Sequence, residues 1–271
     1  MSIIDVWAQI TTPRMAAAPW LATLRRWTGQ DAGDTGVPDV DSTLAAMDKA
    51  GVEISLLAGW HGPEGSLISN EEVAASIDAA PARFRGLACV DLSQPMEAVR
   101  ELRRWVDGDR FVGVRIVPWL WDLPPNDRRY YPIYAACCDL NVPFCTQIGH
   151  TGPLKRSEPG RLIPYLEDVM LDFPELVVVG GHVGFPWLDE LVSMTVKFPN
   201  FYVDTSAYAL HRLPPAFLTY MKTLGAGRVM FGTNWPMLTP AQCLQRLSSL
   251  ELDEAQQEAF LQGTARQVFN L

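Results

Sequence analysis

The segments Val142–His150 (VPFCTQIGH) and Leu176–His182 (LVVVGGH) show the pattern from which the fold of this chain can be predicted. Each is a short apolar run that ends in glycine and histidine, and Pro164–Phe173 between them has the amphipathic spacing of a helix. A strand, a helix and a second strand in this order predict a parallel βαβ unit. Comparable apolar, strand-like runs recur eight times along the chain, at Ile3–Ala8, Val52–Leu57, Arg85–Val90, Val112–Val117, Val142–Ile148, Leu176–Val179, Phe201–Val203 and Arg228–Phe231.

Helical patterns alternate with these runs and predict a single α/β domain over residues 1–271, a (β/α)8 TIM barrel. The chain is close to the ~250 residues typical of such a barrel. An open doubly wound sheet is the alternative, although the glycine-rich fingerprint that it often carries after the first strand is missing. The predicted helices are Asp41–Ala50, Asn70–Ala80, Met96–Val106, Tyr131–Asn141, Pro164–Phe173, Trp187–Phe198, Ala216–Leu224, Pro240–Leu250 and Asp253–Phe269.

Three long irregular stretches, Thr11–Pro38, Gly59–Leu67 and Pro118–Asn126, would follow the first, second and fourth strands. In a barrel they would lie on the face where the βα loops build active sites. Pro124-Pro125 excludes a regular helix in the third stretch, because proline lacks the backbone donor that a helix needs.

The composition limits the partners. A formal charge of −9 argues against nucleic acid and against an anionic membrane surface. No apolar stretch reaches the roughly 18 residues that suggest a membrane-spanning helix. The five cysteines lack metal-type spacing, and Cys145 lies mid-strand in an apolar run, where we expect it to pack in the core. We therefore expect reduced thiols, a cytoplasmic location and a small-molecule substrate, with a homo-oligomer compatible with the composition.

Function in a TIM barrel is expected at the carboxyl ends of the strands. Two histidines there, His150 and His182, are each flanked by glycines, which leave the imidazole rings accessible. A single histidine is often structural, but two at neighbouring strand ends favour a site. The full set of chemically capable residues at these ends is Trp7, Gln9, Trp60, His61, Asp91, Arg115, His150, His182, Asp204 and Asn234.

The ordered motifs resemble the amidohydrolase-related family. They are Ile4–Gln9, Gly149–Gly152, Gly181–Gly184 and Phe231–Pro236, together with Val112–Ile116. The resembling branch includes aminocarboxymuconate-semialdehyde and resorcylate decarboxylases and pyrone-dicarboxylate lactonases. The resemblance covers nearly the whole chain and implies a TIM-barrel enzyme, either a hydrolase or a carbon–carbon lyase.

The sequence departs from this family at the metal ligands. The resemblance implies His-x-His on the first strand, where this chain has Trp7 and Gln9, and an aspartate at the end of the last strand, where it has Asn234. Of the usual metal set only His150 remains. Indole and neutral amides are poor ligands for a divalent metal, so we predict neither a metal nor another cofactor. A site rescued by His150, His182 and Asp204 is the alternative.

The remaining polar residues can still support acid/base chemistry. The resemblance assigns the general acid or base role to His182, and its imidazole can act without a metal. His150 is predicted to assist, and Asn234 to form a hydrogen bond with a developing charge. Arg115 is predicted to hold a substrate carboxylate, or alternatively to pair with an internal carboxylate such as Asp91 or Asp5.

Tryptophans gather at the same strand ends. We expect them to form a dry, aromatic-lined pocket for a ring-bearing substrate. Predicted substrate contacts are Trp7, Gln9, Trp60, Arg115, Trp119 and Trp235, and the tryptophans at or just past strand ends are Trp7, Trp60, Trp119, Trp121, Trp187 and Trp235.

Three functional interpretations follow. The leading one is a metal-independent hydrolase or decarboxylase of a small cyclic or aromatic carboxylate or lactone, with His182, His150 and Asn234 as catalytic residues. A cyclase, isomerase or hydro-lyase on the same barrel is the first alternative. A non-catalytic ligand-binding barrel is the second, because a fold alone does not define a function.

Overall fold

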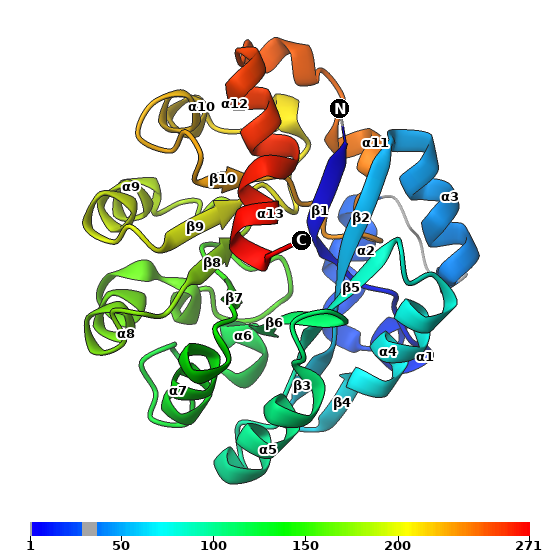
Figure 1. The fold of residues 1–271 in the computed structure, drawn as a ribbon, viewed down its shortest axis with the longest axis vertical. Helices are drawn as coiled ribbons and strands as arrows, with labels where there is room; N and C mark the ends of the chain where they lie inside the picture. Colours follow the sequence, from blue (N-terminus) through cyan, green and yellow to red (C-terminus); the bar gives the residue numbers. More distant parts are fainter. Residues whose placement is uncertain (1, 29–36) are drawn as a thin grey trace.

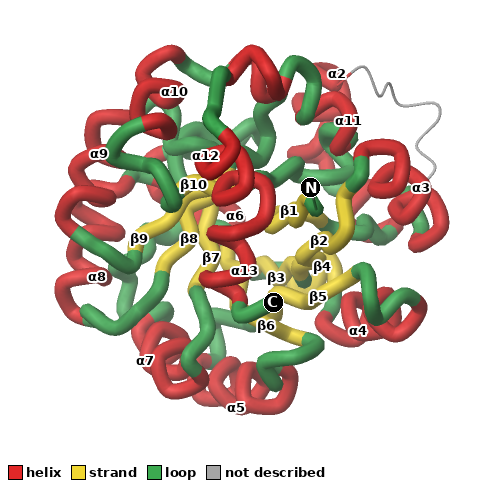
Figure 2. Tube along the Cα trace, turned by 45° about the horizontal axis from the view of Figure 1, so that its top comes forward, coloured by secondary structure: helices red, strands yellow, loops and turns green. Residues whose placement is uncertain are grey.

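The computed structural model describes residues 2–28 and 37–271. Eight parallel strands form one sheet in the order β1-β2-β5-β6-β7-β8-β9-β10, and helices surround them (Figures 1 and 2). This arrangement confirms the predicted TIM barrel. The strands are β1 Ile3–Ala8, β2 Val52–Ala58, β5 Phe84–Ala88, β6 Phe111–Ile116, β7 Phe144–Gln147, β8 Val178–Gly181, β9 Phe201–Asp204 and β10 Val229–Met230, with a separate hairpin of β3 Trp60–Gly62 and β4 Gly65–Ile68.

The barrel closes between β1 and the segment that follows β10. The Val6 amide donates to the Phe231 carbonyl at 3.0 Å, and the Gln9 amide donates to the Trp235 carbonyl at 3.1 Å. An isolated parallel bridge joins Ala8 to Trp235. The first and last motifs of the chain are therefore held side by side at the carboxyl ends of the strands.

Burial explains why the strands appear as continuous apolar runs. Every residue of β1 and of β6 is buried, because one face of each strand meets the barrel interior and the other meets the helices. An alternating polar pattern would have left one face in water. Inward-facing Arg115 on β6 and Asp5 on β1 are exceptions to the apolar pattern of these two strands, and both residues are also buried.

Local signals define the ends of several helices. Asp39 caps α3 by accepting from the Ser42 amide, and Gly51 ends the helix in the left-handed region, at a φ of 73°. Ser69 and Glu72 form a capping box on α4. The helices are α1 Pro13–Ala16, α2 Ala22–Thr28, α3 Val40–Ala50, α4 Asn70–Ala79, α5 Pro95–Trp105, α6 Pro118–Trp121, α7 Tyr131–Leu140, α8 Glu167–Asp172, α9 Leu188–Lys197, α10 Pro215–Lys222, α11 Pro240–Cys243, α12 Glu254–Glu258 and α13 Thr264–Phe269.

Some predicted elements are wrong in their extent. The predicted helix Pro240–Leu250 ends at Cys243, and after Arg246, whose φ is 59°, the chain forms a 3-10 turn over Leu247–Leu250. The last strand stops at Met230 because the Phe231 amide donates to the Phe260 carbonyl instead of to the sheet. Helix Pro164–Phe173 is divided into a π-helical segment, Leu162–Leu166, and α8.

The three stretches predicted to be irregular contain short elements. Part of Thr11–Pro38 forms α1 and α2, while residues 29–36 lie outside the described residues. Gly59–Leu67 contains most of the β3–β4 hairpin. Pro118–Asn126 begins with α6, which ends in the left-handed region at Asp122, two residues before Pro124. These short elements shape the mouth of the barrel.

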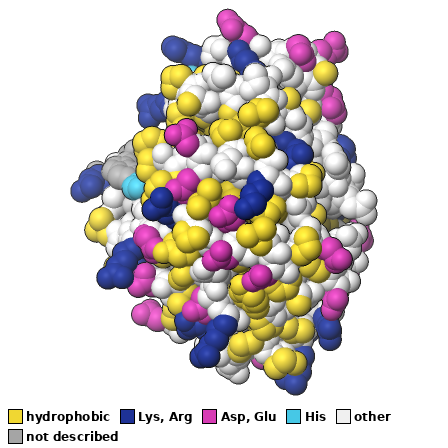
Figure 3. All heavy atoms as spheres, turned by 90° about the vertical axis from the view of Figure 1, so that its left-hand side faces the viewer, with side chains coloured by type: hydrophobic (Ala, Val, Ile, Leu, Met, Phe, Trp, Pro, Cys, Tyr) yellow, Lys and Arg dark blue, Asp and Glu magenta, His cyan; other side chains and the backbone are white. Residues whose placement is uncertain are grey.

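The surface carries charges of both signs. On the face in Figure 3, lysine and arginine side chains alternate with aspartate and glutamate, and no broad field of one sign is visible.

In the part of the chain that the structure describes, no helix combines the length and the apolarity needed to cross a membrane. Cys145 is a buried free thiol, as predicted from its position in an apolar strand.

Candidate active site

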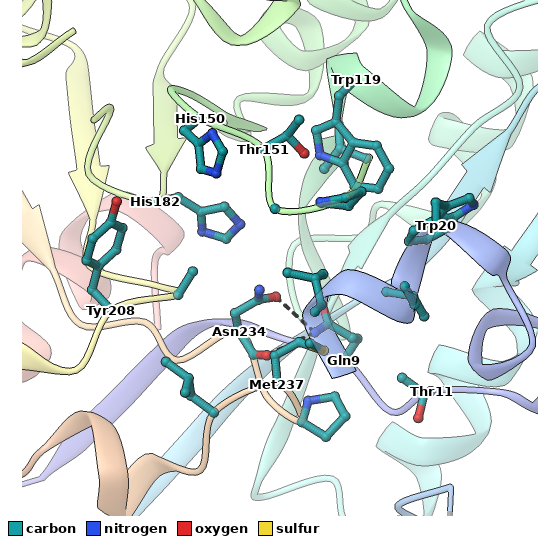
Figure 4. Close-up of a pocket in the computed structure, with 18 of the residues that line it drawn as sticks. Gln9, Thr11, Trp20, Trp119, His150, Thr151, His182, Tyr208, Asn234 and Met237 are labelled. Carbon is teal, nitrogen blue, oxygen red and sulfur yellow. Dashed lines mark hydrogen bonds between the residues drawn. The ribbon is translucent and has the colours of Figure 1, made fainter. Parts of the chain in front are cut away.

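A cavity of about 400 Å³ opens at the carboxyl ends of the strands (Figure 4). Six of the residues predicted from the sequence line it: Gln9, Trp60, Trp119, His150, His182 and Asn234. The side chain of His150 is exposed at the rim. Barrel closure brings these residues together from the first, middle and last parts of the chain.

His182 follows β8 and belongs to a hydrogen-bonded relay. Its Nδ1 lies 2.6 Å from the Ser206 Oγ, and the Ser206 hydroxyl donates to the Asp204 Oδ1. A hydroxyl has one proton, so the Ser206 oxygen accepts from the imidazole and Nδ1 carries the hydrogen. The neutral imidazole therefore has its lone pair on Nε2. This relay makes His182 a base.

The environment keeps the His182 imidazole neutral. Burial and the nearby positive charge of Arg115 lower its pKa to about 3. At neutral pH the Nε2 atom is unprotonated, and with this pKa the imidazole is a weak base until a bound anion, such as a substrate carboxylate, offsets the positive charge of Arg115. His182 must therefore take a proton from the substrate before it can donate one. The same imidazole then acts first as a base and afterwards as an acid.

Asp204 is fully buried at the end of β9. Burial raises the pKa of its carboxyl to about 6, although the Ser206 amide and hydroxyl both donate to Oδ1. Its Oδ2 has no hydrogen-bond partner among the described residues. The carboxylate accepts the hydrogen of the Ser206 hydroxyl and so keeps the Ser206 oxygen turned toward the Nδ1 of His182.

Asn234 is linked to Gln9 across the closure of the barrel. The Gln9 Nε2 donates to the Asn234 Oδ1 at 3.1 Å, and Asn234 has a φ of 66°, a conformation that asparagine tolerates better than most residues. Figure 4 shows the amide oxygen of Asn234 on the side of Gln9 and its amide nitrogen on the side of His182. Asn234 therefore offers a donor to the cavity.

Trp7 and Arg115 lie beneath the cavity and do not line it. Trp7 is fully buried, with its ring centroid 4.9 Å from that of His182, and a Cβ on Gly181 would overlap its ring. The Arg115 guanidinium stacks 4.5 Å from the Trp7 ring and donates to Gln9. Both residues were predicted to contact substrate, but neither is among the residues that line the cavity, whereas Gln9, which accepts from Arg115, does line it. No described carboxylate forms an ion pair with Arg115, so neither Asp91 nor Asp5 is its partner.

The aromatic wall differs from the predicted one. Trp60 and Trp119 line the cavity with their ring centroids 5.9 Å apart, and Trp20 packs 5.1 Å from Trp119. Trp235 points away, and its indole donates to Thr43 on α3. Of the two other tryptophans predicted at the rim, Trp121 stacks on His61, and Trp187 packs with Arg161. The cavity is aromatic, as expected, but a different set of tryptophans lines it.

Sequence reasoning missed Trp20, Tyr208 and Arg212, which also line the cavity. Trp20 lies in the irregular stretch that follows β1. The position of this stretch directly after a strand was the available indication that its side chains could reach the site. Tyr208 and Arg212 lie in the loop after β9, where only the sequence Thr205-Ser206 next to Asp204 marked a strand end. Arg212 has no ion-pair partner among the described residues, so its charge is available at the cavity mouth.

Backbone strain gathers around the cavity. Ala207, Val183 and His182 have φ values of 66°, 53° and 75°. Such values are uncommon for L-residues, although asparagine, aspartate and histidine adopt them more often than the others, and for β-branched Val183 the value is an outlier. Strain of this kind persists where surrounding contacts impose it and is frequent at functional sites. It supports this face of the barrel as the site.

The donor set does not suit a metal of the kind that the resembling family holds. Trp7 has no ligating atom, the Gln9 amide is engaged by Arg115, Trp60 and Asn234, and the His182 Nδ1 by Ser206. Across the residues with described positions, no three histidine, cysteine or acidic side chains converge as metal ligands. The alternative site of His150, His182 and Asp204 is therefore not assembled.

The fold and the cavity define a TIM barrel whose site lies at the carboxyl ends of its strands. The chain belongs to the amidohydrolase family, whose model matches residues 4–271. The sequence is similar to a gamma-resorcylate decarboxylase from Polaromonas sp. JS666, with 23% identity over 85% of this chain and 87% of the relative.

Two solved structures show the same fold. An uncharacterized TIM-barrel protein from Bordetella bronchiseptica has 24% identity and a TM-score of 0.84, with 100% of this chain and 99% of that chain covered. A dihydroxybenzoic acid decarboxylase from Polaromonas sp. JS666, solved with bound manganese and the inhibitor 2-nitroresorcinol, has 20% identity and a TM-score of 0.70. The alignment covers 100% of this chain and 96% of that one.

Proposed function

We propose that this protein is a metal-independent decarboxylase of a small hydroxylated aromatic carboxylate. The observation that carries the proposal is the pairing of a base with a donor: His182 Nε2 and the Asn234 amide nitrogen face one cavity walled by tryptophans. The decarboxylases among its relatives support the reaction class. The tryptophan wall suits the flat, apolar faces of an aromatic ring.

The proposed reaction moves one proton through His182. Nε2 takes the proton of a ring hydroxyl next to the carboxylate, and the imidazolium then gives this proton to the ring carbon that bears the carboxylate. The carbon–carbon bond breaks, carbon dioxide leaves, and its bonding electrons return to the ring as a phenolate. A solvent proton neutralises the phenolate, and His150 at the rim is placed to carry it.

Arg212 replaces Arg115 in the proposed recognition of the carboxylate. It is the one lysine or arginine among the residues that line the cavity, and its side chain reaches the mouth from the loop after β9. A guanidinium can hold a carboxylate through two parallel hydrogen bonds. Because the carboxylate becomes neutral carbon dioxide, this contact helps binding more than it helps the chemical step.

The first experiment is a decarboxylation assay on chelator-treated protein. We would incubate it with 2,6-dihydroxybenzoate and other ortho-hydroxybenzoates in deuterium oxide and in oxygen-18 water. We expect carbon dioxide release, deuterium on the ring carbon that lost the carboxylate, and no labelled oxygen in the phenol product. His182→Ala should lower kcat by about 10²–10⁴-fold, the usual contribution of a general acid or base.

His211→Ala is the matched control, because His211 is exposed and does not line the cavity. The proposal fails if His182→Ala turns over as fast as the parent protein, or if chelation abolishes activity and added manganese restores it. Labelled oxygen in the product would indicate hydrolysis. Tight binding with no turnover of any such acid would indicate a non-catalytic barrel.

A further inference from the structure

Arg115 is a buried cation for which the proposed proton transfer has no use. Its side chain is 2% exposed, and its guanidinium lies 4.5 Å from the Trp7 ring and 5.4 Å from the Trp60 ring. No described aspartate or glutamate lies within ion-pair distance of it. The buried carboxylates of Asp204 and Asp5 act on this charge only from beyond ion-pair distance, and a bound anion above it would add to their compensation.

Arg115 determines the orientation of the Gln9 amide. The Gln9 Oε1 receives a hydrogen bond from the Arg115 Nη2 at 2.8 Å and another from the Trp60 Nε1 at 3.3 Å. Guanidinium and indole nitrogens only donate, so the atom that they contact must be the oxygen of the amide. The nitrogen of Gln9 consequently points to the other side, toward Asn234.

Gln9 in turn determines the orientation of Asn234. The Gln9 Nε2 donates to the Asn234 Oδ1 at 3.1 Å and also to the Trp235 carbonyl. With its oxygen engaged, the Asn234 amide presents its nitrogen to the cavity, on the side of His182 (Figure 4). Arg115 on β6, Gln9 directly after β1 and Asn234 after β10 thus form one chain of donors that runs from a buried cation to the substrate cavity.

We propose that the chain Arg115–Gln9–Asn234 is an anion site that receives the phenolate oxygen of the aromatic substrate. Asn234 touches this oxygen through its amide nitrogen. Gln9 and Arg115 act as positioning residues, and the buried guanidinium polarises both amides in a medium of low dielectric. In this chain a cation fixed by tryptophans would supply the positive potential for an anionic substrate oxygen. This inference rests on the proposed function for the identity of the substrate.

The test uses a coloured phenol and needs no turnover. 2-Nitroresorcinol absorbs differently as phenol and as phenolate, so its spectrum reports which form is bound. We expect the protein to lower the pKa of the bound phenol by about one unit or more, which raises the ratio of phenolate to phenol at least tenfold. A bound spectrum with no such change, or no binding at all, would overturn the anion site.

Gln9→Glu is the decisive variant. A carboxylate can pair with Arg115 but has no hydrogen to donate, so Asn234 must turn its nitrogen toward residue 9 and its oxygen toward the cavity. The substitution keeps the shape of the side chain and reverses the polarity of the site. We expect the pKa of the bound phenol to return to its value in water, and the affinity for the phenolate to fall at least tenfold.

Two controls complete the design. Gln267→Glu adds the same charge at an exposed position on α13 and should leave the spectrum of the bound phenol unchanged. Arg115→Met should also abolish the pKa shift of the phenol, with thermal unfolding measured first because this side chain is buried in the barrel. Unchanged phenolate binding in folded Gln9→Glu contradicts the inference. If the phenol shift appears in the parent protein and is lost in Gln9→Glu while no acid is decarboxylated, the anion site stands and the proposed function fails.

Discussion

At the scale of single residues, His182 and Asn234 lie where the sequence predicted them, but the groups that determine their chemistry were not visible in the sequence. Ser206 is 24 residues away from His182 in the chain, and Gln9 is 225 residues away from Asn234. A strand-end position follows from local periodicity, whereas a hydrogen-bond partner depends on how distant strand ends meet. The sequence therefore identified His182 and Asn234, but it did not show the tautomer of the imidazole or the orientation of the amide.

Ser206 has a testable role as a positioning residue. Ser206→Ala removes the acceptor of the Nδ1 hydrogen, so the imidazole is free to carry its hydrogen on Nε2 instead. In that tautomer the nitrogen that faces the substrate has no lone pair and cannot accept a proton. We expect kcat to fall about 10- to 100-fold with a small change in KM. Nitrogen-15 chemical shifts of His182 should show the change of tautomer in the free protein.

Ser193→Ala serves as the comparison, because Ser193 is exposed on α9 and its side chain forms no hydrogen bond within the described part of the chain. It should leave both kcat and the nitrogen shifts unaffected. A Ser206→Ala protein whose His182 shifts match those of the parent would contradict the relay.

Arg212 provides a second prediction at this scale. Arg212→Gln removes the positive charge at the cavity mouth, so the substrate carboxylate loses its contact before the chemical step. We expect KM to rise about tenfold, equivalent to about 1.4 kcal/mol of binding free energy, while kcat changes little. Steady-state kinetics distinguish this outcome from a fall in kcat, which would place Arg212 in the chemical step instead.

At the scale of elements, the sequence predicted strands better than the pieces between them. The runs of β-branched and apolar residues located all eight strands to within a few residues. The short helices α1, α2 and α6 and the β3–β4 hairpin were missed, because short elements owe their stability to tertiary contacts more than to periodicity. The hairpin carries Trp60, α6 carries Trp119, and a 3-10 turn between α1 and α2, Pro19–Leu21, carries Trp20, so this error changed the predicted aromatic wall.

Helix capping is a property that the local sequence does encode. The Ser69 hydroxyl oxygen accepts from the Glu72 amide, and the Ser69 amide donates to the Glu72 carboxylate at the start of α4. Ser69→Ala should lower the free energy of unfolding by about 1 kcal/mol, the usual cost of losing a cap. The corresponding fall in Tm is about 2–4 °C for a domain of this size.

Ser76→Ala in the same helix is the matched substitution. The Ser76 hydroxyl donates to the Glu72 carbonyl within the helix and caps nothing, so its removal should change the free energy of unfolding by less than about 0.5 kcal/mol. Equal effects of the two substitutions in thermal or urea unfolding would show that the capping box contributes no more than an internal hydroxyl.

At the scale of the whole molecule, Trp7 fills the barrel interior under the cavity. Its ring packs against Gly181 of β8, His182 and the Arg115 guanidinium, so it joins strands from opposite sides of the barrel. Its indole nitrogen has no hydrogen-bond partner among the described residues, a cost of about 1–3 kcal/mol that the packing must offset.

A double-mutant cycle tests this packing. Gly181→Ala should destabilise the barrel by about 1–3 kcal/mol, because the new methyl group overlaps the Trp7 ring. Trp7→Ala alone should cost about 3–5 kcal/mol through the space that it leaves. The double variant should cost less than the sum, since the methyl group then occupies vacated space, and additive effects in urea unfolding would contradict direct packing.

The sequence by itself determined the barrel, the strand-end positions of His150, His182 and Asn234, and the absence of imidazoles at Trp7 and Gln9. These are properties of contiguous residues, whose hydrophobic periodicity and side-chain chemistry need no partner to be recognised. Only the tertiary structure decided that Trp7 and Arg115 lie beneath the cavity, that Arg212 reaches its mouth, and that Gln9 joins Arg115 to Asn234. The physical reason is that barrel closure sets which distant strand ends come within hydrogen-bond distance, and this depends on the packing of the entire chain.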